Sequence, residues 1–142
     1  MRFPAAVFLL SALVSPAAFA AKPDSVDRVA AEPRYDPATV IDVTGTVVSV
    51  REAPPGDPLT GVHLKVDTES ETMDIYLGPA DFLKEFEIVF SKGDTVQIVG
   101  SRVNLGAGHV LLAREVRKGE IFLYLRDRAG HPNWPPRHIP TT

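Results

Sequence analysis

Apolar and polar residues alternate along several short segments of the chain, and this period of two is typical of half-buried β-strands. The clearest cases are residues 62–67 and 73–77. A hairpin around Glu69-Ser70 places the apolar members of both segments on one face, as the pleat of a sheet requires. The pairs that this register predicts are Val66 with Met73, Leu64 with Ile75, Val62 with Leu77, and His63 with Tyr76 on the outer face.

Four further segments are strand-like because they are rich in β-branched residues or alternate in the same way. Turns rich in glycine, proline and polar residues separate them. Two of the segments contain an internal glycine, Gly45 or Gly100, where a barrel strand often bends or bulges. The four segments are residues 39–52, 95–103, 109–117 and 121–126.

Residues 78–87, between the third and fourth predicted strands, form the one convincing helix pattern after the N-terminal segment. Pro79 suits the first helical position, where its missing N–H costs nothing. Asp81 follows in the first turn, where a negative charge meets the positive end of the helix dipole. An apolar stripe with helical spacing predicts that the helix fills part of a core. The stripe consists of Phe82, Leu83 and Phe86, with Phe90 beyond it.

The order of these elements is three strands, a helix, two strands and one extra strand. This order matches the OB-fold, a five-stranded, partly open barrel with its helix between the third and fourth strands. We therefore predict a mainly β, OB-fold-like barrel of five to six strands over residues 39–128. The alternative is a β-sandwich or roll with one helix.

Six short stretches between Gly45 and Trp134 carry a resemblance to known proteins. They are GTVVSV (45–50), GVHLKV (61–66), LGPADFL (77–83), GDTVQIVGSRV (93–103), LLAREVRKG (111–119) and LRDRAGHPNW (125–134). In these stretches the chain resembles small exported bacterial OB-fold proteins of uncharacterised function. The resemblance implies an OB-fold and an exported protein, and it brings no catalytic motif.

The chain is also similar in plan to two other periplasmic groups, the stress-related exported OB-fold proteins and the small copper-binding barrels of metal efflux systems. The stress-related group has an aspartate- and aromatic-rich strand pattern that this sequence lacks. The copper-binding barrels use one His, two Met and one Trp on the barrel wall. After the leader, this chain has one methionine, Met73, and the hairpin register places it inside the barrel. That departure argues against a copper site on the barrel wall.

Residues 1–20 have the pattern of a secretory signal peptide. Arg2 precedes an apolar stretch, and Ala18-Phe19-Ala20 fits the small-x-small cleavage rule. The apolar stretch is shorter than the roughly 20 residues that a membrane span needs. We therefore expect a periplasmic or secreted protein without a membrane span, with a flexible lead-in over residues 21–38 and a proline-rich tail over 129–142.

Composition excludes several classes of function. The chain contains no cysteine, which excludes disulfides, thiol catalysis and thiolate metal sites. Its formal net charge is -3, so it lacks the general basic footprint of a nucleic-acid-binding domain. A local basic patch remains compatible with this charge.

The tail and the second hairpin carry the residues most open to a chemical role. His131 and His138 lie near Trp134 and could bind copper or zinc weakly, although a solvated tail is the favoured interpretation. Within residues 130–134 we expect a turn that lets Trp134 cover an open end of the barrel. Four carboxylates form an acidic edge, which we interpret as a solvated hairpin rather than a catalytic pair. They are Asp67, Glu69, Glu71 and Asp74.

The last predicted strand offers a different candidate site. Phe122 and Tyr124 alternate with leucines, and Arg126 follows them among several other basic residues. Single-stranded nucleic-acid binders combine such stacking aromatics with cations. The alternative is that these aromatics cover the barrel.

OB-folds bind ligands through their second and third strands and through the loops that join strands one to two and four to five. In this chain the loops are residues 54–59 and 104–109. We therefore predict a non-catalytic binding or accessory module, without a cofactor, that contacts an envelope protein or a small ligand. The alternatives are a single-stranded nucleic-acid-binding domain and a weak copper or zinc carrier. The candidate binding residues are His63, Lys65, Asp74, Tyr76, Asn104 and His109, with Phe122, Tyr124 and Arg126 on the last strand.

Overall fold

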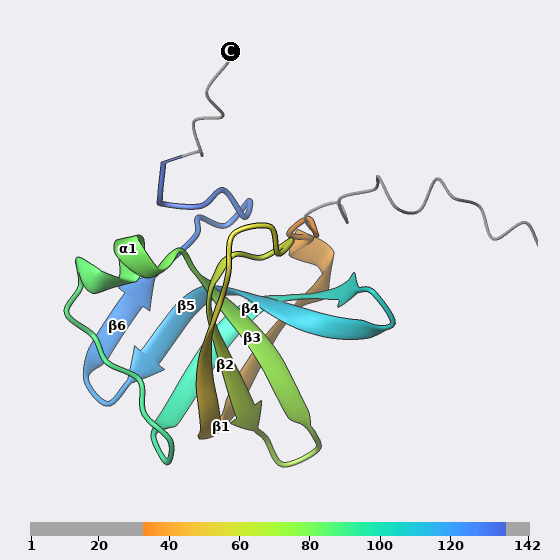
Figure 1. The fold of residues 1–142 in the computed structure, drawn as a ribbon. Coiled ribbons are helices and arrows are strands. Elements are labelled where there is room, and N and C mark those ends of the chain that lie inside the picture. Colours follow the sequence, from red (N-terminus) through yellow and green to blue (C-terminus); the bar gives the residue numbers. More distant parts are fainter. Residues whose placement is uncertain (1–32, 136–142) are drawn as a thin grey trace, which may run out of the picture.

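The structure, a computed structural model, describes residues 33–135 (Figure 1). The predicted signal peptide, most of the lead-in and His138 lie outside the described residues. No helix among residues 33–135 is long and apolar enough to cross a membrane. The elements in chain order are η2 (Pro37–Thr39), β1 (Val40–Ala53), β2 (Gly61–Asp67), β3 (Thr72–Gly78), α1 (Ala80–Lys84), β4 (Thr95–Leu105), β5 (Gly108–Lys118) and β6 (Ile121–Tyr124).

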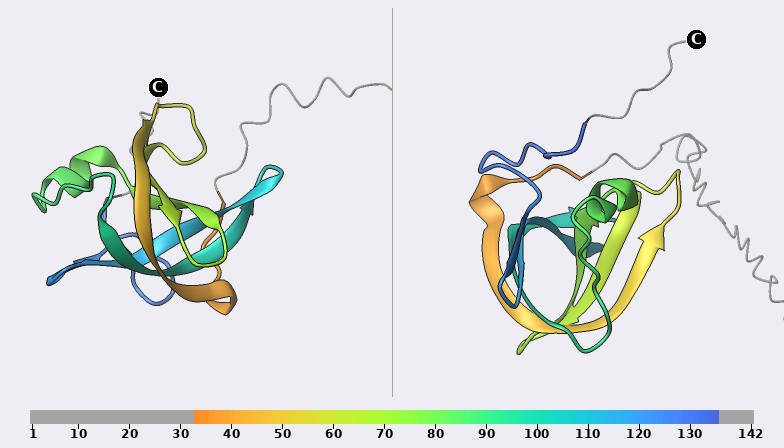
Figure 2. Two further views of the ribbon diagram at one scale, coloured as in Figure 1. Left: turned by 90° about the horizontal axis from the view of Figure 1, so that it is seen from below. Right: turned by 90° about the vertical axis from the view of Figure 1, so that its left-hand side faces the viewer.

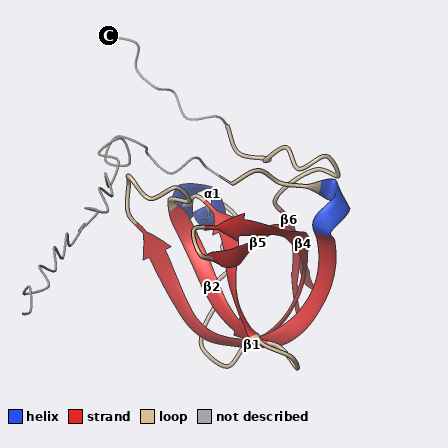
Figure 3. Ribbon diagram, turned by 90° about the vertical axis from the view of Figure 1, so that its right-hand side faces the viewer, coloured by secondary structure: helices blue, strands red, loops and turns tan. Residues whose placement is uncertain are grey.

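Five of the six strands close into a barrel. The long strand β1 pairs with β2 along one part of its length and with β4 along the other, and it curves around the barrel in Figure 2 and Figure 3. β3 and β5 run parallel and close the barrel through Ile75 opposite Leu111. β6 extends the sheet beyond β5. The structure therefore confirms the predicted mainly β, OB-fold-like barrel with one helix between β3 and β4.

The barrel interior is filled by the apolar sides of the alternating strands. Each large aliphatic side chain buried there contributes about 1.5–3 kcal/mol relative to exposure. Because the chain has no cysteine, this core and the backbone pairing of the strands hold the barrel closed without disulfides. Its buried members include Val47, Leu64, Val66, Met73, Ile75, Leu77, Val96, Ile98, Leu111, Val116, Leu123 and Leu125.

The β2–β3 hairpin has most of the predicted register. Val66 pairs with Met73, Leu64 with Ile75, and His63 with Tyr76. The fourth predicted pair is wrong, because Val62 lies opposite Gly78 instead of Leu77 after a register shift between Val62 and His63. The physical reason is a close approach of two glycines: a Cβ on Gly61 would collide with the carbonyl oxygen of Gly78. No alternation pattern reports such a contact.

The helix is shorter than predicted. It spans Ala80–Lys84 instead of residues 78–87, because Gly78 ends β3 and Pro79 is the N-cap instead of the first helical residue. After the helix, backbone N–H groups bond to carbonyls three residues earlier, which makes the turn tighter. Glu87 then adopts a left-handed φ of 54°, which ends the helical conformation. Leu83 is buried, but Phe86 is 47% exposed and touches the ring of Phe82 edge-on. The predicted apolar stripe therefore reaches the core only in part.

The remaining strands match their predicted positions within two residues at each end. β6 ends at Tyr124 instead of Arg126. The N–H groups of Leu125 and Arg126 both reach the carbonyl of Arg114, which is the geometry of a bulge and ends regular pairing. The register of β4 against β5 shifts between Val99 and Gly100, so Gly100 lies at a bulge as predicted.

Both ends of the described chain pack against the barrel. In the lead-in, the N–H of Asp36 donates to the hydroxyl of Ser101 in β4 at 2.9 Å. In the tail, Trp134 lies against Phe82 of α1 and against Tyr76, with ring centroids 5.4 and 6.4 Å apart. The lead-in and the tail also touch each other, because the ring of Tyr35 lies over Gly130.

Candidate binding groove

A hollow of about 720 Å³ lies between the segment that precedes β1 and the outer part of β4. We call it the groove. Residues 34–37 form one wall, and Arg102, Val103 and Asn104 of β4 form the other together with His109 of β5. The lead-in and the predicted loop between β4 and β5, which are far apart in sequence, therefore share one site.

One edge of β4 is free in the groove. Pairing with β1 ends at Ser101, because the chain before β1 turns away as η2, whereas pairing with β5 continues to Leu105. The resulting hairpin projects from the barrel in Figure 1. Because a two-residue turn follows Leu105, the N–H and C=O groups of Leu105 point toward β5. Along a strand these groups point to alternate sides from one residue to the next. The backbone groups of Arg102 and Asn104 therefore point away from β5, toward the groove.

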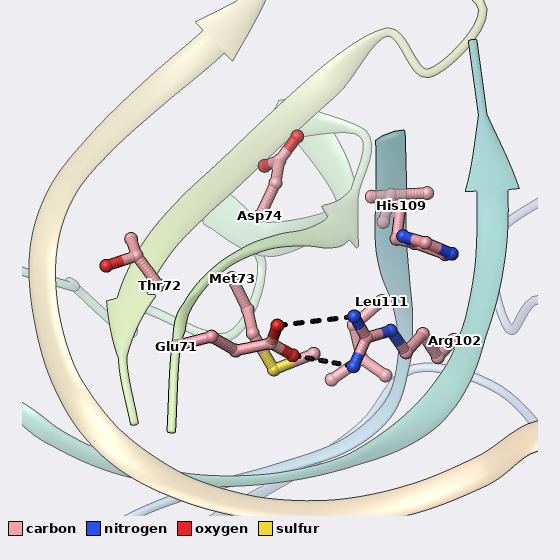
Figure 4. A pocket seen from close by; sticks show the side chains of 8 residues that line it. Glu71, Thr72, Met73, Asp74, Arg102, His109 and Leu111 are labelled. Carbon is pink, nitrogen blue, oxygen red and sulfur yellow. Dashed lines mark hydrogen bonds and ion pairs between the residues drawn. The ribbon is translucent and has the colours of Figure 1, made fainter. Parts of the chain in front are cut away.

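A smaller hollow of about 140 Å³ continues the groove toward the start of β3. Figure 4 shows Glu71 reaching across it to Arg102, with His109 beside the pair. The guanidinium of Arg102 donates to both carboxylate oxygens of Glu71, at 2.6 and 3.3 Å. Both side chains are more than a third exposed, so this ion pair contributes at most about 1 kcal/mol to stability. Its main effect is to fix the position of Arg102 between the two hollows.

The groove combines apolar side chains with charged ones. Tyr35, Ile41 and Val103 supply apolar surface, and Arg34 and Asp36 supply opposite charges. The buried hydroxyl of Tyr35 has no hydrogen-bond partner within the part of the chain that the structure describes. A surface of this composition suits a polypeptide, which presents apolar side chains and backbone polar groups together.

A polar network lies on the outer face of β2 and β3. His63 is buried, and its Nε2–H donates to the carbonyl of Leu59 at 2.8 Å. Its Nδ1 lies 3.2 Å from Asp74 Oδ1 and 3.3 Å from a nitrogen of Arg51. Nδ1 can therefore donate to Asp74 when it carries a hydrogen, or accept from Arg51 when it does not.

Asp74 is the ionisable group that this network perturbs. Partial burial raises the pKa of Asp74, but the hydrogen bond and the charge of His63, together with Arg51, act in the opposite direction. The net result is a pKa for Asp74 below its ordinary value. The carboxylate is therefore held ionised, as expected for a structural ion-pair partner rather than a proton donor at neutral pH.

Part of the outer face of β2 and β3, which we predicted to bind ligands, is covered by the chain itself around His63 and Tyr76. Tyr76 is 4% exposed and donates its hydroxyl hydrogen to the carbonyl of Thr60 at 2.8 Å. His63 is 1% exposed and holds the same loop through Leu59. A second apolar cluster fills this face beneath the loop, the lead-in and the tail. It consists of Leu59, Tyr76, Val110 and Leu112, with Tyr35, Val103, Leu105 and Trp134 packed against it.

The structure brings three of the predicted binding residues to the groove and its smaller continuation: Asp74, Asn104 and His109. His63 and Tyr76 instead support the loop between β1 and β2. Lys65 is exposed on β2.

The predicted stacking platform is only partly assembled. Phe122 and Tyr124 are 55% and 58% exposed, and the guanidinium of Arg117 lies 5.0 Å from the centre of the Phe122 ring. Arg126 does not join them, because it is 9% exposed and donates to the carbonyl of Gly130. It lies instead against the rings of Trp134 and Tyr35, where it connects the tail to the lead-in.

Three of the four residues of the acidic edge, and His131 of the tail, have side-chain partners. Thr72 donates its hydroxyl to Asp67, and Glu71 and Asp74 have the partners described above. His131 lies 3.0 Å from Asp127. No group of three or more His, Asp or Glu side chains within residues 33–135 is arranged to hold a metal ion.

The sequence predicts one side of the groove, with Asn104 and His109, but not the wall that residues 34–37 form. Arg34 and Tyr35 fall in the segment that we predict to be a flexible lead-in, although a lone tyrosine in a proline-rich charged stretch is a usable signal. The pairing of Glu71 with Arg102 left no signal in a single sequence, because the two residues are separated by 31 positions and belong to different hairpins.

Comparison with known proteins places the chain in a family. The model of the MamS/MamX magnetosome protein family matches residues 39–123, which is more than half of the chain. The chain therefore belongs to this family. The matched region contains β1 to β5 and most of β6, but it leaves out the 34–37 wall of the groove and Trp134. No curated protein matches the chain.

Proposed function

We propose that this member of the family is a non-catalytic binding module of the magnetosome that holds an extended segment of a partner protein in the groove. The observation that carries the proposal is the free edge of β4 between Arg102 and Asn104, which lines that groove. The family supplies the magnetosome context, and the groove supplies the kind of ligand.

Strand addition is the binding mode that this geometry fits. An extended peptide pairs through its backbone with an exposed sheet edge, and its alternate side chains enter neighbouring pockets. Here the edge lies beside Tyr35, Ile41 and Val103, which suit alternate apolar side chains. Natural proteins usually protect such edges, so an unprotected edge within a groove of this size supports a binding role.

The covered face of β2 and β3 supports the same choice. Its tyrosine and histidine are buried and hold the protein's own loop, so they do not offer the stacking surface of a nucleic-acid-binding OB-fold. A net charge of -3 also favours a protein ligand over a polyanion.

The proposed location is outside the cytoplasm. It is supported by the signal-peptide pattern of residues 1–20 and by a chain without cysteine that needs no reducing environment. Mass spectrometry of the protein from its native host tests this proposal, because export predicts a mature chain that begins near Ala21.

The groove is tested by site-specific photo-crosslinking in the native host. A photoreactive amino acid at position 104 should give a defined adduct with one partner protein, whereas the same amino acid at Lys65, which is also exposed, should not. Equal labelling from both positions, or none from position 104, would reject the groove as the site.

The binding mode is tested with the purified partner and two substitutions at one position. Asn104→Pro removes a backbone donor from the free edge without removing a bond to β5, whereas Asn104→Ala changes only the side chain. We expect a loss of about tenfold in affinity for Asn104→Pro, corresponding to one hydrogen bond, and little change for Asn104→Ala. If the two variants bind alike while both remain folded, the partner does not add a strand to β4.

A further inference from the structure

From the edge of the sheet opposite the groove, we infer that two copies of this chain associate by pairing β6 with β6 of the second copy. β6 is the last strand in the sheet order. Five of the six large apolar side chains that are exposed in the described chain lie on β6 or on the loop after α1, which Figure 1 shows above and beside it. They are Phe86, Val89, Ile121, Phe122 and Tyr124.

The loop is held next to β6. Lys118, which pairs with Ile121 across the hairpin, donates to the carbonyl of Val89 at 2.6 Å and lies 2.9 Å from Asp94. Val89 is 70% exposed and Ile121 is 53% exposed, so this side of the hairpin presents apolar surface beside the ion pair of Lys118 with Asp94. Phe122 and Tyr124 alternate with Leu123, whose side chain enters the core, and they are therefore exposed on the other face. The strand edge consequently has apolar side chains on both faces.

The backbone of β6 is arranged to accept another strand. The N–H of Leu125 bonds to the carbonyl of Arg114 in β5, so the backbone groups of alternate residues before it, Leu123 and Ile121, also face β5. The N–H and C=O groups of Phe122 and Tyr124 face outward. Asn133 donates its side-chain amide to the Tyr124 carbonyl, whereas within residues 33–135 no hydrogen bond is made to the outward groups of Phe122.

A second copy is the occupant because the edge is complementary to itself. A two-fold axis at Phe122 places the outward groups of Phe122 opposite the same groups of the other copy, which forms an isologous interface. In that register the two Phe122 rings are cross-strand neighbours. In each copy the guanidinium of Arg117, from β5, lies over the Phe122 ring.

The available area suits a modest dimer. Large side chains that are about half exposed offer roughly 100 Å² each, so the five together offer about 500 Å² per copy. Stable interfaces bury about 800 Å² per partner, and the strand backbone and the flanking charged residues supply part of the remainder. An interface near this lower limit predicts a dissociation constant on the order of micromolar.

Sedimentation velocity of the mature chain tests the association. We expect a dimer that dissociates on dilution through the micromolar range and that Phe122→Lys converts to a monomer. Val50→Lys is the matched control, because Val50 is also exposed, at 43%, but belongs to β1 instead of β6. A wild-type chain that stays monomeric at several hundred micromolar, or a folded Phe122→Lys variant that dimerises like wild type, would overturn the inference.

Disulfide trapping tests the register, because the chain has no cysteine of its own. Residues paired at the axis have Cα atoms about 5.5 Å apart, within disulfide range. Phe122→Cys should therefore form a covalent dimer in a glutathione redox buffer. Tyr124→Cys should not, because its two copies lie about 13 Å apart along the strands. Trapping at 124 in preference to 122 would contradict the proposed pairing.

A truncated chain distinguishes a second copy from residues 136–142 of the same chain as the occupant of the edge. Deletion of these residues should leave the dimer unchanged. A dimer that appears only after the deletion would overturn the inference and assign the edge to the chain's own C-terminal segment. None of these measurements depends on the groove.

Discussion

Trp134 gives the sharpest test of how the tail is attached to the barrel. Its ring contacts Tyr76 and Phe82 and lies 5.0 Å from the guanidinium of Arg126. It also packs against the Cα of Gly78, where a Cβ would leave too little room for the indole. Trp134→Ala removes all of these contacts at once, and the change lies outside every strand of the barrel.

The expected loss can be worked out from burial. Replacing a fully buried aromatic residue by alanine costs about 3–5 kcal/mol. Trp134 is only partly buried, so we expect about half of this, or roughly 2 kcal/mol including its cation–π contact. For a domain of about 100 residues, this corresponds to a fall in Tm of roughly 10 °C.

Urea unfolding followed by circular dichroism measures this free energy. Trp134→Phe is the control, because it keeps an aromatic ring in the same place and should recover about half of the loss. Trp134 is the single tryptophan of the chain, so its fluorescence in the wild-type protein reports directly on this site. A Trp134→Ala variant within about 0.5 kcal/mol of wild type would refute the reasoning and show that the tail does not add to the stability of the fold.

Three further predictions concern the barrel itself. The pKa of Asp74 is lowered in the folded state, so the stabilisation by its carboxylate is complete above the ordinary pKa near 4 and is lost as the pH falls through the folded-state pKa. Asp74→Asn should therefore lower the free energy of unfolding at pH 7 and weaken the pH dependence of that free energy below pH 4. An acid-unfolding profile equal to that of wild type would contradict this. His63→Ala leaves the buried carbonyl of Leu59 without its donor and should cost about 2 kcal/mol, with faster backbone amide exchange in residues 57–60; protection equal to wild type there would show that His63 does not hold the loop. Gly100→Ala places a Cβ against the carbonyl of Leu112 and should destabilise by more than 2 kcal/mol in a thermal melt, whereas Gly106→Ala, at a turn with open space around it but with a φ of 59°, should cost about 1 kcal/mol.

The groove and the β6 edge place two distinct surfaces at different edges of the same sheet. β4 is free only where it extends past β1, and β6 is free because it ends the strand order. A chain that dimerises through β6 would present two grooves, one on each copy. Binding of a partner with two equivalent segments would then be strengthened by the second contact.

The local pattern of the sequence determined the barrel. Strict alternation in β2 and β3 predicted which side chains face the core, because a shift by one residue would have turned Leu64 and Ile75 out to solvent. The helix was placed correctly between β3 and β4, but its length was not, because its ends depend on Gly78 belonging to a strand and on the backbone at Glu87.

The tertiary structure alone decided which surface is available to a ligand. Alternation assigns His63 and Tyr76 to the outside of the barrel, and both are indeed on that side, yet both are buried. The side chains that cover this face come from Leu59 in the loop between β1 and β2 and from Tyr35 and Trp134, near the two ends of the described chain. Periodicity reports only the local direction of a side chain, whereas burial depends on what distant segments bring to it. The sequence could therefore determine the barrel, but the covered face, the groove and the free edges followed only from the fold.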